Sequence, residues 1–148
     1  MNAITVYRIG RWCHLKRIPV VPRLVHYLIF TFYNSYVPAA AEIGPGTLLL
    51  CGGMGVVVHP ATRIGRNVMI GTQVTFGGRG GQGRTGVPVV EDDVRIGAGT
   101  RILGPIRIGE GALIGPNSVV IDDVPPHSIV AGIPAKILRR DIDFKDYL

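Results

Sequence analysis

The sequence has few reactive side chains: two cysteines, Cys13 and Cys51, and four histidines among 148 residues. Two thiols can form at most one disulfide, and a reduced chain is the simpler interpretation. The N-terminal segment lacks the basic region and apolar core of a cleavable signal peptide. No apolar run is long enough to span a bilayer. These absences predict a cytoplasmic protein.

Other absences exclude whole classes of fold. Helix bundles are excluded because the 21 glycines and 11 prolines would interrupt long helices. Intrinsic disorder is excluded because 47% of the residues are hydrophobic. Collagen is excluded because glycine does not fall at every third position. A single domain of this length is therefore expected to repeat short strands and tight corners.

The formal net charge is +6, which indicates a partner that carries phosphate, either a nucleic acid or an anionic cofactor. Lysine and arginine are scattered, with a cluster near each end, and no aromatic residues are interleaved with them. Nucleic-acid surfaces instead show a clustered basic patch or stripe. The pattern predicts no nucleic-acid partner.

Residues 1–36 are basic and aromatic, and Pro19 and Pro22 divide them into two predicted helices, 6–17 and 23–36. One interpretation is a helical cap that packs on the repeat domain or on a neighbouring subunit, because repeat arrays need their exposed ends covered. The alternative is a peripheral contact with an anionic membrane, at its inner face, because five basic residues precede a short apolar run. The need for a cover favours the cap.

A period of six residues dominates the chain from residue 43 onward. An apolar residue, often followed by glycine, starts each hexad, and a small or β-branched residue stands four positions later. The side chains at both positions point inward. Glycine or asparagine stands at the corner, because these residues adopt a positive φ at little energetic cost. Three hexads close one triangular coil, and stacked coils form a parallel solenoid. We therefore predict a solenoid over residues 37–140, with an excursion loop at 77–88 and a C-terminal tail at 141–148.

Two stretches carry a family resemblance. "IGRNVMIGTQVTFGGRGG" and "RILGPIRIGEGALIGPNSVVIDDVPPHSIVAGIPAKIL" resemble the serine acetyltransferase branch of the hexapeptide-repeat acyltransferases. The resemblance covers about residues 37–140. It implies an all-β, left-handed parallel β-helix, acetyl-CoA as donor, and a homotrimer with active sites between subunits. Short relatives of this shape are typical of polysaccharide gene clusters, where they acetylate sugar hydroxyls.

Transfer of an acetyl group to a hydroxyl needs a base, and a positioned imidazole accelerates such a step by roughly 10²–10⁴-fold. His14 and His26 lie in the cap, and His127 is expected to be structural. His59 stands at the second place of its hexad, where glycine stands in most others, so its ring must point outward. We predict that His59 is the catalytic base; a plain surface histidine is the alternative.

The repeat slips at one point, because nine residues separate Leu49 from Val58 where six are due. The three extra residues predict a bulge at a coil corner, which the local glycines permit. By resemblance, Cys51 and Gly52 occupy the place of the family's aspartate and catalytic histidine, so we place them in the substrate site. A solenoid corner offers no helix dipole to activate a thiol, and Cys51 is expected to be buried and inert.

By resemblance, a second family histidine and the arginine beside it that holds the serine carboxylate fall in the excursion. Gly86 and Val87 stand at that place here. Arg79 and Arg84 remain as substrate-binding candidates on this glycine-rich loop, which can cover the acceptor and exclude water. Because the family's carboxylate partner is missing, we predict a sugar or surface-polysaccharide hydroxyl as the acceptor. Serine is the alternative acceptor.

The resemblance also implies where the cofactor lies. The pantetheine arm of acetyl-CoA would run past Gly97, Ala98 and Gly99. The phosphates would then meet the basic residues near the C-terminus, Lys136, Arg139 and Arg140. The alternative for these last three is a solvated basic tail.

Two further classes remain as rivals. A catalytically silent trimeric scaffold is one, because the family's histidines are missing. A zinc carbonic anhydrase on the same solenoid is the other, and it needs three histidine ligands. Only His59 and His127 lie in the repeat, so no metal site is predicted.

Overall fold

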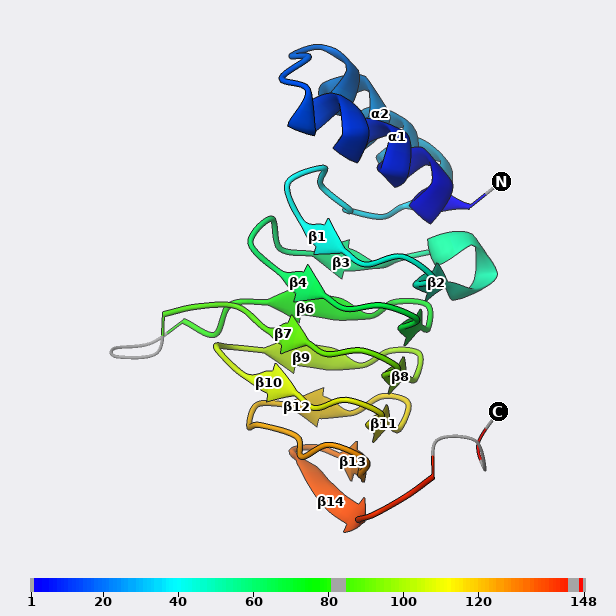
Figure 1. Ribbon diagram of the computed structural model, residues 1–148. Helices are drawn as coiled ribbons and strands as arrows, with labels where there is room; N and C mark the ends of the chain where they lie inside the picture. Colours follow the sequence, from blue (N-terminus) through cyan, green and yellow to red (C-terminus); the bar gives the residue numbers. More distant parts are fainter. Residues whose placement is uncertain (1, 81–84, 144–146, 148) are drawn as a thin grey trace.

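The computed structural model describes residues 2–80, 85–143 and 147. Two helices, α1 (Ala3–Leu15) and α2 (Val21–Tyr33), pack against each other at one end of a solenoid (Figure 1). Both begin earlier than predicted: the Asn2 side chain accepts the N–H of Ile4 and caps α1, and Pro22 is tolerated in the first turn of α2. Within the described ranges, no helix combines the length and apolarity that crossing a membrane requires.

From residue 42 onward, short strands wind into a left-handed parallel β-helix with three faces (Figure 1). The first face contains β1 (Glu42–Ile43), β4 (Arg63–Ile64), β7 (Val89–Val90) and β10 (Arg107–Ile108). The second contains β2 (Leu48–Leu49), β5 (Met69–Ile70), β8 (Arg95–Ile96), β11 (Leu113–Ile114), β13 (Ile129–Gly132) and β14 (Ala135–Arg139). The third contains β3 (Val57–Val58), β6 (Thr75–Gly77), β9 (Arg101–Leu103) and β12 (Val119–Val120). The described strands pair in parallel, except that β14 turns back antiparallel to β13.

The hexad starts form continuous columns inside the β-helix. On the first face, Ile43 pairs with Ile64, Ile64 with Val90, and Val90 with Ile108. All four are buried, and each fully buried side chain of this size contributes about 1.5–3 kcal/mol. The second predicted inward position is also buried throughout, at Thr47, Thr62, Val68, Val74, Val94, Thr100, Ala112 and Ser118.

The glycine at the second place of a hexad has a different cause from the predicted one. A Cβ added to Gly71 would lie 2.5 Å from the backbone nitrogen of Ala98, and one added to Gly97 would lie 2.5 Å from that of Pro116. Glycine is therefore needed there because the coils approach too closely for a side chain. Positive φ falls instead on the residue before the small inward one, as at Asn67 (55°).

The cap closes the first end of the β-helix through backbone carbonyls that no coil covers. The Tyr7 hydroxyl donates to the carbonyl of Ala41 at 2.5 Å. Arg11 donates to the carbonyls of Ala39 and Ala40 at 3.0 and 2.9 Å. Burial raises the pKa of Tyr7, so the phenol remains a donor. Side chains of α1 thus provide hydrogen-bond donors for the backbone carbonyls at the exposed end of the array.

The buried threonine hydroxyls are not equally satisfied. Thr100 Oγ1 donates to the carbonyl of Gly97 at 2.7 Å, and Thr47 Oγ1 donates to that of Gly65 at 2.8 Å. Thr62 Oγ1 is fully buried and has no hydrogen-bond partner in the described part of the chain. A buried hydroxyl without a partner destabilises the fold.

We expect Thr62→Val to raise the free energy of unfolding by about 1 kcal/mol, because it replaces an unsatisfied hydroxyl with a methyl group of the same shape. The matched variant Thr100→Val should lower it by about 1 kcal/mol, because that hydroxyl is hydrogen-bonded. Denaturant unfolding curves measure both. Equal destabilisation by the two substitutions would show that Thr62 has a partner.

Candidate active site

The candidate residues lie at two different corners of the triangular coil. His59 follows β3, and the excursion follows β6, so both turn from the third face to the first. We call this corner the His59 edge. The short 3₁₀ turn η1 (Leu50–Gly53) follows β2, and residues 97–99 follow β8, so both turn from the second face to the third. We call this corner the η1 edge.

His59 fits its corner because the next coil leaves the stack there. The N–H of His59 donates to the carbonyl of Phe76 at 3.0 Å, just before the excursion begins. Gly77 still pairs with Leu103, and the excursion departs from the coil directly after it (Figure 1). His59 therefore lies beside the described part of the excursion rather than under a stacked corner, and it is exposed, as predicted.

The gap between the two coils forms a pocket of about 470 Å³ on the His59 edge. Its walls come from the corner after β3 and from the described part of the excursion. They consist of His59, Ala61, Gly78, Arg79, Gly80, Thr85, Gly86 and Val87. Among these residues Arg79 carries the only permanent charge. The other predicted loop cation, Arg84, lies outside the described residues.

The imidazole of His59 is oriented by its own turn. The backbone N–H of Ala61 donates to His59 Nδ1 at 3.1 Å, so the neutral ring carries its proton on Nε2. Accepting a proton at Nε2 requires the other tautomer and the loss of this bond, which costs about 1 kcal/mol. A base that accelerates a reaction 10²–10⁴-fold lowers the barrier by about 3–5 kcal/mol. The local bond therefore does not prevent base catalysis.

The extra residues after Leu49 form the predicted bulge at a corner, η1. Cys51 has φ 50°, and Gly52 and Gly53 have φ 76° and 92°. Gly53 is buried against α1, since a Cβ there would lie 3.1 Å from the Cβ of Ala3. Cys51 is exposed. The expectation of a buried thiol was wrong, because Gly53 and Leu49 fill the interior and turn Cys51 outward.

The residues predicted for the cofactor lie away from the His59 pocket. Gly97, Ala98 and Gly99 stand on the η1 edge, two coils beyond η1. Gly97 and Gly99 donate their backbone N–H groups to neighbouring coils, to Ile114 and Thr72. The basic residues Lys136, Arg139 and Arg140 are exposed at the far end of the second face. Arg139 donates to the Tyr147 hydroxyl at 3.1 Å.

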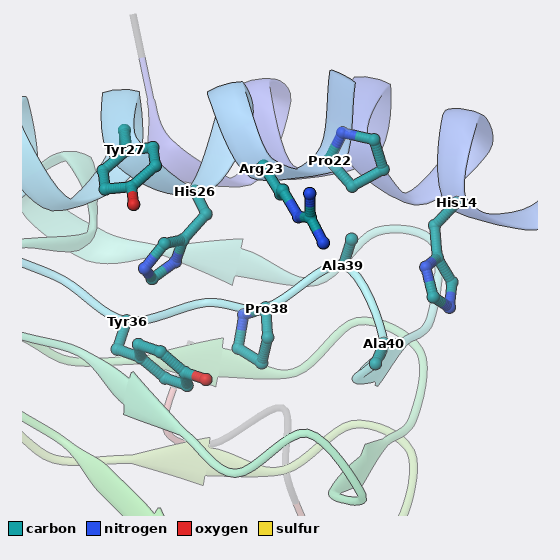
Figure 2. A pocket seen from close by; sticks show the side chains of 9 residues that line it. All are labelled: His14, Pro22, Arg23, His26, Tyr27, Tyr36, Pro38, Ala39 and Ala40. Carbon is teal, nitrogen blue, oxygen red and sulfur yellow. The ribbon is translucent and has the colours of Figure 1, made fainter. Parts of the chain in front are cut away.

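A second cavity, of about 330 Å³, lies between the cap and the first coil. Figure 2 shows His14, Arg23 and His26 pointing from the helices toward the segment 36–40. The rings of His26 and Tyr36 meet edge to face, 5.0 Å apart. Because Tyr36 pairs with Val57 of β3, this cavity continues the His59 edge toward the cap. Sequence reasoning missed it, because its walls come from three separate segments.

Comparison with known proteins identifies the family. The family described as bacterial transferase hexapeptide (six repeats) matches residues 88–122. The serine acetyltransferase of Bacillus subtilis is 34% identical over 153 residues, which cover 99% of this chain and 70% of that protein. The chain belongs to the serine acetyltransferase family. The enzyme of Synechococcus elongatus is 36% identical over 139 residues, covering 94% of this chain and 57% of its relative. The chain thus spans little more than half of that relative.

Solved structures of the family have the same fold. The Neisseria gonorrhoeae serine acetyltransferase in complex with serine superposes with a TM-score of 0.81 at 36% identity, covering 90% of this chain and 54% of that one. A serine acetyltransferase in complex with CoA superposes with a TM-score of 0.81 at 34% identity, covering 92% of this chain and 55% of that one. The left-handed β-helix is therefore the fold of this family member.

One thiol of each chain is expected to react rapidly with a water-soluble disulfide reagent, because Cys51 is exposed and Cys13 is buried. Cys51→Ser should remove the rapid reaction, and unfolding should expose Cys13. Absorbance titration of native and denatured protein counts the thiols. A rapid reaction that survives in Cys51→Ser would contradict the burial of Cys13.

Proposed function

We propose that this protein is an acetyl-CoA-dependent O-acetyltransferase that acts on the hydroxyl of serine. The observation that carries the proposal is that His59 and Arg79 line one pocket. A free amino acid needs a cation for its carboxylate and a base for its hydroxyl. Membership of the serine acetyltransferase family supports the same reaction class, and relatives have been crystallised with serine and with CoA.

In the proposed reaction, His59 removes the proton of the serine hydroxyl as the oxygen attacks the thioester carbonyl. The C–S bond then breaks, and the imidazolium returns the proton to the leaving thiolate, so that no net proton is consumed. Arg79 binds the carboxylate and fixes the position of the hydroxyl.

The placement of the other candidates supports a homotrimer with shared sites. Cys51, Gly52 and the 97–99 corner lie on the η1 edge, whereas His59 and Arg79 lie on the His59 edge. Two edges of one prism cannot face each other, so one copy's η1 edge would complete the site on a neighbouring copy. Lys136, Arg139 and Arg140 would then meet the phosphates of CoA, since exposed basic side chains suit phosphate.

The rival acceptor is a sugar hydroxyl. Gly86 and Val87, which line the pocket, stand where the resemblance places the family's carboxylate-binding arginine and second histidine. A sugar needs no such cation, so the two acceptors differ in their dependence on Arg79.

His59→Ala is expected to lower kcat with serine by about 10²–10⁴-fold, with a smaller change in KM, because it removes the base and leaves the carboxylate contact. Steady-state release of CoA measures both constants. His127→Ala is the matched control, since His127 occupies a corner turn with φ 49° in the last coil. Undiminished turnover in His59→Ala would assign the base to another group.

Arg79→Gln is expected to raise KM for serine by about tenfold or more and to change kcat less, because the lost contact is a charge-assisted bond to the carboxylate. Arg66→Gln, another exposed arginine outside this pocket, is the control. Better turnover of sugar acceptors than of serine, unaffected by Arg79→Gln, would establish the sugar alternative.

A further inference from the structure

The outer surface of α1 is apolar although it faces away from the β-helix. Tyr7, which hydrogen-bonds Ala41, marks the inner side of α1. Ile9 and Trp12 lie roughly 200° and 140° around the helix from Tyr7. They are 57% and 59% exposed. No described part of the chain covers them.

The outer surface of α2 is apolar as well. Ile29 is fully buried and marks the inner side of α2. Val20, at the start of the helix, and Leu24 lie roughly 180° and 140° around from it. They are 68% and 57% exposed. We call Ile9, Trp12, Val20 and Leu24 the outer cap face; Figure 1 shows the two helices at the end of the molecule opposite β14.

The charges around this face have one sign. Residues 1–41 contain four arginines and one lysine and no aspartate or glutamate. Arg8 and Arg11 are hydrogen-bonded to carbonyls of the first coil. Lys16 and Arg17, in the turn between the helices, are exposed, and no ion pair with them is found in the described ranges. The face therefore combines apolar side chains with cations that no acid neutralises.

We propose that the outer cap face binds an anionic membrane surface as a peripheral contact. Exposed tryptophan, leucine and isoleucine flanked by lysine and arginine suit the boundary between headgroups and acyl chains, and each cation near an anionic surface strengthens binding. A second copy of the face is the poorer partner, because it would bring the same cations together with no acid to pair them. The contact does not depend on the catalytic function proposed above.

The contact would hold the His59 pocket close to lipid. Between them lie one layer of helices, about 10 Å thick, and one to two coils, spaced about 4.8 Å apart. The pocket would thus be about 15–20 Å from the membrane surface.

Trp12 is the chain's single tryptophan and lies in the proposed contact, so its emission tests the proposal directly. The full chain is mixed with vesicles of phosphatidylcholine alone, or of phosphatidylcholine with phosphatidylglycerol. With the anionic vesicles we expect a shift of the emission to shorter wavelength and co-sedimentation of the protein, both weakened by salt. With neutral vesicles we expect much weaker effects.

Paired variants distinguish binding through the outer cap face from binding through the overall charge or hydrophobicity of the protein. Lys16→Ala with Arg17→Ala should weaken binding by about fivefold for each cation removed, whereas Arg66→Ala with Arg140→Ala, an equal change of charge elsewhere, should not. Ile9→Ser with Leu24→Ser should weaken it by about tenfold. Ile133→Ser with Leu138→Ser, at exposed apolar residues of the opposite end, is its control. All substituted residues are exposed, and circular dichroism verifies folding.

Three results would overturn the proposal. One is an unchanged Trp12 emission and no co-sedimentation with anionic vesicles. Another is binding that the Lys16 and Arg17 substitutions leave unaltered. The third is an emission shift without vesicles that grows with protein concentration, together with larger species in sedimentation velocity, because a second copy would then cover the face.

Discussion

The register between successive coils is the constraint on which the rest of the structure depends. Most strands contain only two or three residues, too few to be stable alone, so each coil is held by the coils before and after it. The column of Ile43, Ile64, Val90 and Ile108 is the result. A register slip of one residue would turn the side chains of such a column outward. The six-residue repeat prevents the slip, because it places an apolar side chain at the same inward position of every coil.

This register lets the backbone and side chains vary only at the corners of the coils. The candidate active site lies at one of these corners. Where two corners stack normally, the backbones approach so closely that even a Cβ is excluded, as at Gly71 and Gly97. His59 lies instead beside the excursion, which departs from the next coil after Gly77. The same departure opens the pocket and brings Arg79 to it. A break in the repeat thus supplies both the space and the reactive groups.

The open end of the array imposes a second requirement. The first coil has carbonyls with no coil above them, and Tyr7 and Arg11 of α1 satisfy them. This function uses the inner side of α1. On the outer side of the cap, the described ranges show exposed apolar residues together with cations that form no ion pair. The closeness of the cap to the first coils links that surface to the His59 edge.

Much of the fold could be predicted from the sequence because a repeat encodes its geometry locally. The inward positions, the extra residues after Leu49 and the outward direction of His59 all follow from counting in sixes. The exposure of Cys51 did not follow, since it depends on Gly53 packing beneath α1, a contact between residues far apart in the chain. The second cavity has the same origin, because its walls come from both helices and the first coil.

The sequence by itself therefore determined the β-helix, the family resemblance and the outward direction of His59, because each rests on residue type at a fixed spacing. Only the tertiary structure decided which candidates share a site. It placed Arg79 with His59 and separated both from Cys51 and the 97–99 corner. The reason is that a triangular coil distributes neighbouring hexads over three edges, while its stacking joins residues about eighteen positions apart, as Val58 and Phe76 are joined.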